Sequence, residues 1–340
     1  MMKRRFVSTS VALLLALGML GSPAPTRAAP ITVLGARIPF YLDRPEEKRV
    51  DSLIYRGGLL LASPASGFGG WSDIAVSADG SEILAISDDA HWLRAHLTYD
   101  RGGDLAGIDS ADMAPMLDLN GRPMIGKDGD AEGLTLEHAN DTKGAVLVSF
   151  ERNVRVWRYD LKDGFTARPT NVPIGDWVKP LRDNEQLEAI TLVKPDTLLA
   201  IAEAKVAPGD DILAAFETYP GNGTAHSRML SVVPHDPFAV TSVATAPDGG
   251  IFLLERRFSL AGGVGMEIRH VDSADIREGA HLEGKVLANV GFQNTNIDNM
   301  EGIAVRKGRN GETLLYLISD NNYSPLQRTL LLMFELKAQP

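Results

Sequence analysis

A short unit recurs five times along the chain, and this repetition limits the folds that the sequence can adopt. Each unit has an apolar run, a turn rich in Asp, Gly, Asn or Pro, and a second apolar run that ends at or near an acidic residue. The units span Ser72–Asp89, Ala131–Glu151, Leu187–Glu203, Thr241–Glu255 and Asn299–Asn322. Because two apolar runs around a polar turn are typical of a β-hairpin, each unit predicts a pair of antiparallel strands.

The spacing of the units predicts the architecture. Aligned on the position of Glu301, the units begin at Ser72, Glu132, Glu188, Thr241 and Glu301, at intervals of 60, 56, 53 and 60 residues. Hairpin signals that recur at such a period are typical of β-propeller blades. Candidate third strands follow three of the hairpins, at Trp92–Asp100, Val154–Leu161 and Met266–Asp272. Long helical periodicity is absent, so an α/β fold is not expected.

The ends of the chain predict how the ring closes. The last unit has three strand candidates, GIAV, LLYLIS and TLLLMFEL, before the sequence ends at Pro340. Two strand candidates, Ile31–Gly35 and Ser52–Leu61, precede the first unit. One of them is expected to complete the last blade and remove its open edge. We therefore predict an all-β fold, a single β-propeller of five blades closed by an N-terminal strand; six blades remain possible if the N-terminal segment and a degenerate unit form another.

The first 29 residues resemble an export signal. Lys3, Arg4 and Arg5 form a positive segment, Val11–Leu20 is apolar, and small residues follow at Ala28 and Ala29. This layout predicts a cleaved signal peptide and a periplasmic or secreted protein, with the propeller at 30–340. The export route, general or twin-arginine, stays open. No later stretch is apolar enough for a membrane span.

Charge and cysteine content narrow the possible partners. The chain has 34 basic and 44 acidic residues, and removing the four basic residues of the leader leaves 30 against 44, a net charge of −14. An acidic chain is not expected to bind nucleic acid or anionic membranes. Because the chain contains no cysteine, thiolate nucleophiles and cysteine metal sites are excluded. We expect a monomer that binds a small molecule.

The two ends of each predicted hairpin carry polar residues at matched positions. A first column, at the start of the first strand, reads Ser72, Glu132, Glu188, Thr241 and Glu301. A second column, at the end of the second strand, reads Asp88, Glu151, Glu203, Glu255 and Asp320. The strands of a hairpin run antiparallel, so the two columns are expected to meet at one rim of the central channel. Candidate substrate-binding cations follow the second column, at Arg152, Lys205 and Arg256.

Two interpretations of these carboxylates remain open. A ring of carboxylates repels itself, so either cations lie among them or their pKa values rise. A hard cation such as Ca²⁺, which takes roughly six to eight oxygen ligands, fits such a ring. In the other interpretation the carboxylates cap turns and form salt bridges between blades. We expect Ca²⁺ as the cofactor.

Other catalytic patterns are weaker. The sequence contains neither the G-x-S-x-G motif of a serine hydrolase nor the H-E-x-x-H motif of a zinc protease. His91, three residues after Asp88, is the histidine that adjoins the predicted rim and is a candidate general base. A plain turn position for His91 is the alternative.

Several of these motifs together resemble one known family. The segments WSDIAVSADG, DAEGLTL, QLEAITL, NMEGIAV, LLERRFS and LISDNN are similar to the phytase-like β-propeller family of exported bacterial proteins, often described as having esterase-like activity. The resemblance extends roughly from Gly57 to Leu336. It implies a relation to calcium-dependent alkaline phytases, six-bladed propellers in which Ca²⁺ ions at one face hold phosphates and activate water.

The resemblance implies roles for individual residues. Glu132, Glu188 and Glu301 would be catalytic metal or water ligands, and Arg152, Lys205 and Arg256 would hold phosphate. The second column would supply further metal ligands or supports, namely Asp88, Glu151, Glu203, Glu255 and Asp320. Ser72 and Thr241 stand in the first column where other units have Glu, and five blades depart from six.

Three functions therefore remain. The first, which we expect, is a calcium-dependent phosphoesterase or related hydrolase acting on a small anionic ester. The second is a propeller lactonase with a single central metal, for which Glu132, Asn153, Glu188 and Asp320 are candidate ligands. The third is a non-catalytic periplasmic binding propeller.

Overall fold

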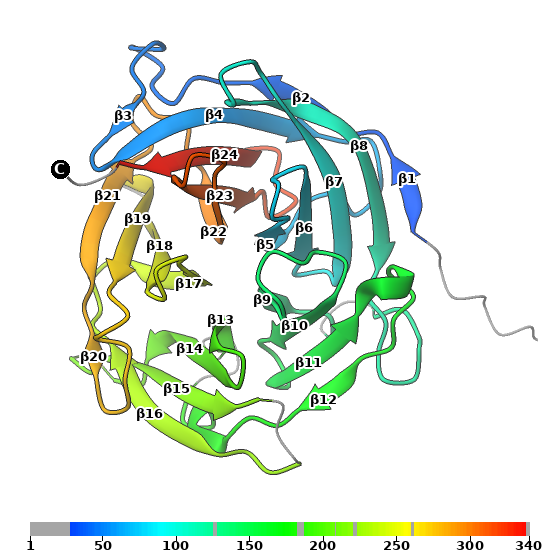
Figure 1. Ribbon diagram of the computed structural model, residues 1–340, viewed down its shortest axis with the longest axis vertical. Coiled ribbons are helices and arrows are strands. Elements are labelled where there is room, and N and C mark those ends of the chain that lie inside the picture. The colour runs from blue at the N-terminus through cyan, green and yellow to red at the C-terminus, as the bar shows by residue number, and fades with distance from the viewer. Residues whose placement is uncertain are drawn as a thin grey trace, which may run out of the picture.

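The computed structural model describes residues 28–124, 128–181, 187–207, 209–219, 223–259 and 262–337. These residues form five β-sheets arranged around a central axis (Figure 1), which confirms the all-β, five-bladed propeller. The described residues contain no α-helix, and short 3-10 turns such as η2 (Leu161–Asp163) and η3 (Asp176–Val178) lie between strands. Of the predicted export signal, residues 1–27 lie outside the described part.

Each blade has four main strands, ordered from the axis outward. The innermost strands are β5 (Trp71–Val76), β9 (Ala131–Leu136), β13 (Leu187–Lys194), β17 (Ala239–Thr245) and β22 (Asn299–Lys307). The second strands are β6 (Glu82–Ser87), β10 (Ala145–Phe150), β14 (Thr197–Lys205), β18 (Ile251–Ser259) and β23 (Thr313–Asp320). The third strands are β7 (His91–Tyr99), β11 (Arg155–Asp160), β15 (Ile212–Thr218), β19 (Gly263–Val271) and β24 (Thr329–Leu336). The outer strands are β8 (Leu105–Pro115), β12 (Thr170–Val172), β16 (Ser227–Val232), β21 (Lys285–Gly291) and β4 (Leu53–Ala62).

An N-terminal strand closes the ring, as predicted, and of the two candidates it is the second, which forms β4. It pairs antiparallel with β24, from Leu53 opposite Leu336 to Leu61 opposite Thr329. The N-terminal segment thus supplies the outer strand of the last blade, and Figure 1 shows β4 outside β24. Short additional strands extend the outer edges: β1 (Ala29–Ile31) on β8, β2 (Leu34–Arg37) and β3 (Arg49–Val50) on β4, and β20 (His281–Leu282) parallel to β16.

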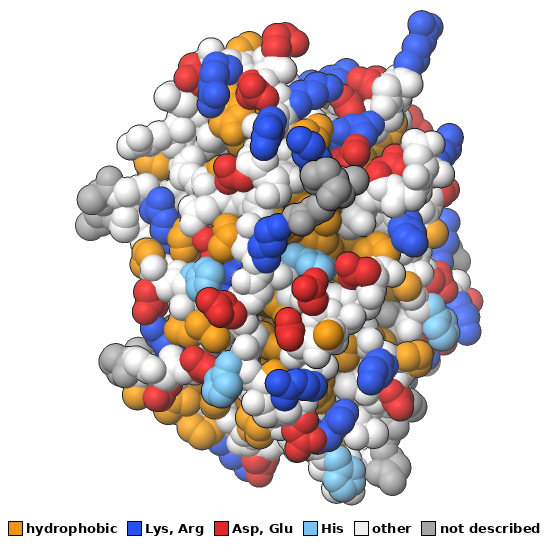
Figure 2. Space-filling model, turned by 60° about the vertical axis from the view of Figure 1, so that its left-hand side comes forward, with side chains coloured by type: hydrophobic (Ala, Val, Ile, Leu, Met, Phe, Trp, Pro, Cys, Tyr) orange, Lys and Arg blue, Asp and Glu red, His pale blue; other side chains and the backbone are white. Residues whose placement is uncertain are grey.

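The apolar runs of the repeat bury both faces of each blade. On β6, Ile83 and Ala85 pack toward the last blade, whereas Leu84 and Ile86 pack toward the second. Because side chains alternate across a strand, a continuous apolar run is what a sheet buried on both faces requires. Five apolar clusters result, one between each pair of neighbouring blades. By contrast, acidic and basic side chains are interspersed on the outer side that bears β21 (Figure 2).

Every innermost strand has a β-bulge near its start. Met300 pairs with Ser319 and Gly302 with Ile318, so Glu301 is an extra residue without a partner on β23. The same one-residue shift in strand register leaves three further residues without a partner: Ser72, Glu188 and Thr241. In the second blade, two residues, Glu132 and Gly133, lie opposite Ser149. The first sequence column is therefore the set of bulge residues, and a bulge turns its side chain out of the regular ladder.

The residue after the bulge packs closely against the next blade, which predicts the effect of adding a methyl group. A Cβ at Gly302 would lie 2.7 Å from the Cα of Asp73 and 2.9 Å from Cγ2 of Ile318. Overpacking typically costs about 1–3 kcal/mol, so we expect Gly302→Ala to lower the free energy of unfolding by about 2 kcal/mol in urea denaturation. The strand residue Gly35, where the nearest atom would be 3.5 Å away, is the matched control, and Gly35→Ala should be neutral. Equal effects at both glycines would contradict this packing.

Candidate carboxylate site

The bulge residues open into a cavity at one rim of the central channel. The cavity has a volume of about 1190 Å³. Nine carboxylates line it: Asp88, Asp130, Glu132, Glu151, Glu188, Glu203, Asp298, Glu301 and Asp320. Three guanidinium groups also line it, those of Arg152, Arg256 and Arg328. The expectation that the two columns meet at one rim is therefore met for most of their members.

In the first column, four of the five side chains line the cavity. They are Ser72, Glu132, Glu188 and Glu301. Thr241 is instead buried, and its hydroxyl donates to the backbone oxygens of Leu254 at 3.3 Å and Met300 at 3.4 Å.

In the fourth blade the second column contains an arginine, not a glutamate. Val240, the residue before the bulge of the fourth blade, pairs with Glu255 on the second strand. In the other four blades, the residue before the bulge pairs with Ser87, Phe150, Ala202 or Ser319. The residues that follow these partners are Asp88, Glu151, Glu203 and Asp320, so the equivalent in the fourth blade is Arg256. The sequence alignment that placed Glu255 in the ring was wrong by one residue. Since neighbouring residues of a strand point to opposite faces, this error reverses the direction of the side chain.

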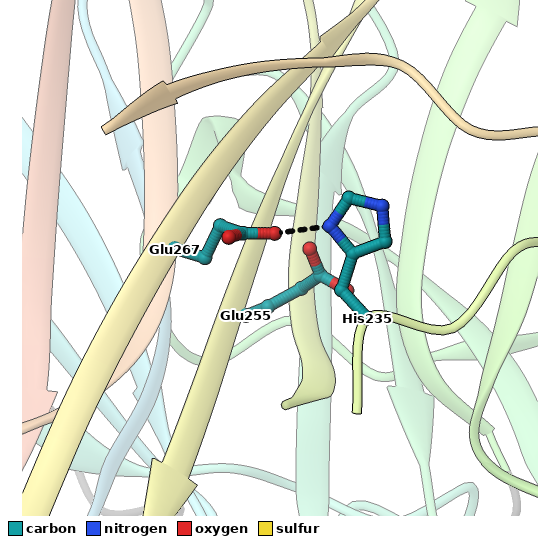
Figure 3. A group of neighbouring side chains, drawn as sticks. All are labelled: His235, Glu255 and Glu267. Carbon is teal, nitrogen blue, oxygen red and sulfur yellow. Dashed lines mark hydrogen bonds and ion pairs between the residues drawn. The ribbon is translucent and has the colours of Figure 1, made fainter. Parts of the chain in front are cut away.

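Glu255 points into the body of its blade. Its two carboxylate oxygens accept hydrogen bonds from Nε (2.5 Å) and Nη2 (2.6 Å) of Arg269, and both side chains are fully buried. Glu267 accepts a hydrogen bond from His235 Nδ1 at 2.5 Å, and both side chains lie beside Glu255 (Figure 3). Glu255, Glu267 and His235 could together supply three ligand atoms to a metal. The guanidinium of Arg269 already binds both oxygens of Glu255, so the cluster is satisfied internally.

Three other predicted residues do not line the cavity. Lys205 binds both carboxylate oxygens of Asp236, at 2.7 and 2.8 Å. His91 packs beside Gly67, and burial lowers the pKa of its imidazole. Asn153 borders a separate surface pocket with Val154 and Gly175. The structure thus brings Arg152 and Arg256 to the carboxylates but leaves Lys205, His91 and Asn153 outside.

Within the ring, carboxylate oxygens converge in two groups of three. One group is Asp130, Glu132 and Glu151, and the other is Glu151, Glu188 and Glu203. In each group the candidate ligand atoms lie within 4.8 Å of one another. We call these the first and second triads; Glu151 belongs to both.

Arginine side chains neutralise only part of the negative charge of the ring. Arg256 Nε lies 2.8 Å from Glu301 Oε1, and its Nη2 lies 3.6 Å from Glu203 Oε1. Arg152 Nε lies 2.9 Å from Asp130 Oδ2. Both cations therefore lie at the border of the triads, and carboxylates outnumber guanidinium groups nine to three around the cavity.

Burial, together with the excess of negative charge, raises the pKa values of carboxyl groups in the ring. Burial, followed by the neighbouring carboxylates, raises the pKa of Glu132 and of Glu188 well above the ordinary value. Burial raises the pKa of Glu301 to about 7, although Arg256 opposes the shift. Burial and Asp320 raise the pKa of Asp88 to about 7. A bound cation would relieve this mutual repulsion.

Some cavity residues escaped the sequence analysis. Asp130 and Asn299 each precede a bulge glutamate by two positions, and Asn299 Nδ2 donates to Glu301 Oε1 at 2.5 Å. A third column, two residues before the first, would have found both. Asp298 binds Arg328 Nε at 3.1 Å, and no repeat signal pointed to this pair.

Next to the bulges, Asp73 ties several blades together near the axis. Its Oδ2 accepts from the backbone N–H of Leu134 on β9 at 2.7 Å, and its Oδ1 accepts from Ser242 Oγ on β17 at 2.8 Å. The backbone N–H of Ile74 donates to Oδ1 at 2.8 Å. The carboxyl is buried and is thus a structural crosslink adjacent to the site.

A smaller cavity of about 460 Å³ lies at the other ends of the innermost strands. Its lining is mainly apolar, with Lys194 and Lys307 among the charged residues. Glu137, its lining carboxylate, is bound by Arg158 at 2.8 Å. No member of the two columns lines this cavity, so the columns are associated with the larger one.

No curated protein matches the chain. Among solved structures, the PQQ-bound form of an aldose sugar dehydrogenase from Streptomyces coelicolor is similar at 14% identity and a TM-score of 0.39, over 82% of this chain and 98% of that chain. That likeness is too distant to carry an activity. In the described part of the chain, no helix has the length and apolar character needed to cross a membrane.

A family model described as "Phytase-like: Esterase-like activity of phytase" matches residues 66–323. The match contains all five bulges and every member of the two columns. The five-bladed propeller and the carboxylate rim account for the repeated motifs within that range. The chain belongs to the phytase-like family.

Proposed function

We propose that this protein is a calcium-dependent hydrolase of small anionic esters, with phosphate monoesters as the favoured substrates. The observation that carries the proposal is the pair of triads that share Glu151. The family match supports a hydrolase-like activity of this propeller but specifies neither the metal nor the substrate.

The donor set of the triads fits calcium. The described ligand candidates in the triads are all carboxylate oxygens, which hard cations prefer over softer metals. Oxygens on opposite sides of a Ca²⁺ ion lie at most about 5 Å apart, since Ca–O distances are about 2.3–2.6 Å. The 4.8 Å spread of each triad is compatible with that limit. Asp130, Glu132, Glu151, Glu188 and Glu203 would hold the metal, and Asp88 and Asp320 border the same cavity.

The remaining residues would bind and orient the ester. Bound calcium would polarise the ester oxygens and supply an acidic water. Arg256 and Arg152 line the same cavity and would bind ester oxygens through their N–H groups. Glu301 lies beside Arg256 and outside both triads, and its pKa of about 7 suits a group that accepts a proton near neutral pH.

The same proposal includes export. The N-terminal sequence has the layout of a signal peptide, and we propose that the propeller at 30–340 works in the periplasm or outside the cell as a monomer.

Calcium titration of the protein purified without its leader tests the metal site. We expect Glu151→Gln to weaken Ca²⁺ binding at least tenfold in isothermal calorimetry, because it removes a negative ligand from both triads. Asp89→Asn is the matched control, since Asp89 is exposed and adjoins Asp88 without belonging to a triad. Unaltered Ca²⁺ affinity in Glu151→Gln would contradict the site.

Turnover requires a separate assay. Wild type should hydrolyse phosphate monoesters in Ca²⁺ and lose the activity in chelator, and Glu188→Gln combined with Glu301→Gln should abolish it. Lactone hydrolysis with one transition metal would favour the lactonase alternative. Calcium binding without turnover of phosphate, carboxyl or lactone esters would favour a binding propeller.

A further inference from the structure

The carboxylate cavity also has an apolar border. Four exposed side chains line it: Leu42 (59% exposed), Phe258 (66%), Phe292 (44%) and Leu326 (90%). Ten large hydrophobic residues are similarly exposed in the described part of the chain, so four of the ten adjoin this one cavity. Together with Val264 we call these residues the apolar wall. Exposed apolar groups gathered in a concave site mark a ligand-binding surface.

The wall is held in place by the backbone around it. On the β18–β19 hairpin, Phe258 pairs with Val264, and the carbonyl of Val264 accepts the backbone N–H of Phe292 at 3.1 Å. The ring of Phe292 lies against Gly263, where a Cβ would be 2.3 Å from the ring. Gly263 has φ +58°, so both its backbone and its lack of a side chain allow this position. The ring is therefore positioned by close packing while it stays exposed.

The charges of the cavity limit the number of anionic groups that a ligand can carry. Each of the three lining arginines already binds a carboxylate: Arg152 with Asp130 at 2.9 Å, Arg256 with Glu301 at 2.8 Å and Arg328 with Asp298 at 3.1 Å. Nine carboxylates surround them. A ligand with many phosphates would meet this negative field with few positive groups to receive it. A ligand with a single anionic head meets much less repulsion.

We propose that the cavity takes amphiphilic phosphate monoesters, with one phosphate head at the carboxylate ring and an alkyl or aryl group on the apolar wall. This inference rests on the proposed function, because the ring must hold a cation before it can hold phosphate. The apolar wall then determines specificity, since burying an apolar substituent against exposed Leu and Phe side chains removes both surfaces from water.

Binding of n-alkylphosphonates in Ca²⁺ tests the wall without turnover. Their C–P bond is not an ester, so calorimetry reports affinity alone. We expect the affinity to rise about twofold per added methylene from methyl- to octylphosphonate, because the wall leaves one side of the chain in water and full burial gives about fourfold. Butylphosphonate should also bind more tightly than 3-hydroxypropylphosphonate, whose substituent has the same number of non-hydrogen atoms but ends in a hydroxyl group.

Matched leucine variants test whether the apolar wall is the surface that binds the alkyl chain. Leu42→Ser should lower the affinity for octylphosphonate about fivefold and that for methylphosphonate less than twofold. Leu34→Ser is the control, because Leu34 is 65% exposed and is not among the cavity-lining residues. Phe258→Ser should act as Leu42→Ser does. Each of these side chains is exposed, so none of the variants is expected to unfold the protein.

The outcomes separate the two proposals. Affinity that does not depend on chain length, or equal effects of Leu42→Ser and Leu34→Ser, would overturn the apolar wall even if phosphate esters are hydrolysed. A chain-length dependence that Leu42→Ser weakens and Leu34→Ser does not, without hydrolysis of any ester, would support the wall and overturn the proposed hydrolase. No binding by any phosphonate in Ca²⁺ would overturn both.

Discussion

Replacing Arg269 by methionine is expected to lower the free energy of unfolding by about 3–5 kcal/mol, because it leaves the buried Glu255 carboxylate without its partner. Both side chains are 0% exposed, and the guanidinium binds the two carboxylate oxygens at 2.5 and 2.6 Å. The guanidinium also donates to the backbone oxygens of Val233 (3.0 Å) and Glu283 (2.5 Å), so its loss affects two loops as well. Urea denaturation of wild type and variant measures the difference.

A double variant shows whether the loss of stability comes from the unpaired buried carboxylate or from a general packing defect. Replacing a buried ion pair by apolar residues of similar volume is often neutral, whereas breaking it is costly. Arg269→Met combined with Glu255→Leu should therefore recover at least half of the stability lost in Arg269→Met alone. A double variant that is less stable than the single variant would show that Glu255 does not carry the cost.

Replacing Asp73 by alanine is expected to cost a similar amount, about 3–5 kcal/mol. The change leaves the N–H groups of Leu134 and Ile74 and the hydroxyl of Ser242 without their shared acceptor in a buried place, and each such loss costs about 1–3 kcal/mol. Because these donors lie on different blades, the variant should also loosen the inner strands. Urea denaturation gives the stability, and hydrogen exchange at Leu134 reports the local opening.

Asp73 also predicts a pH dependence of stability. Burial raises the pKa of Asp73 to about 8, and the hydrogen bonds to its carboxyl oppose that shift. The folded protein then binds a proton more tightly than the unfolded chain, so the free energy of unfolding should fall as pH rises from about 4 to about 8. Asp73→Asn never ionises, so in chelator its stability should depend less on pH than that of wild type. Equal slopes would mean that the hydrogen bonds keep Asp73 ionised throughout this range.

The propeller was predictable from the sequence because its signals are local and repeated. Each blade needs an apolar run on every inner strand, since both sheet faces are buried, and each hairpin needs a polar turn. These requirements recur with every blade and produced the visible period. Ring closure by an N-terminal strand followed from the missing fourth strand of the last blade, and the structure selected Ser52–Leu61 over Ile31–Gly35.

The site was predictable only where residue spacing agreed with strand register. Glu301 and Asp320 lie 19 positions apart in their unit, whereas Glu188 and Glu203 lie 15 apart, because the hairpin turns differ in length. The distance in sequence from the first-column residue therefore does not predict which residue ends the second strand. In the fourth blade a one-residue error exchanged Glu255 for Arg256, which inverted both the charge and the direction of the side chain.

The sequence by itself determined the class of fold, closure of the ring by an N-terminal strand and the resemblance to the family, because these depend on patterns that recur along the chain; the structure then chose five blades over six and β4 as the closing strand. The tertiary structure decided which carboxylates converge into triads, that an arginine stands in the ring at Arg256, and that Glu255, Lys205 and His91 lie elsewhere. It also revealed Asp73 and the apolar wall, whose members come from distant segments without a common motif. The physical reason is that bulges and strand register set side-chain direction, and both depend on pairing with other strands.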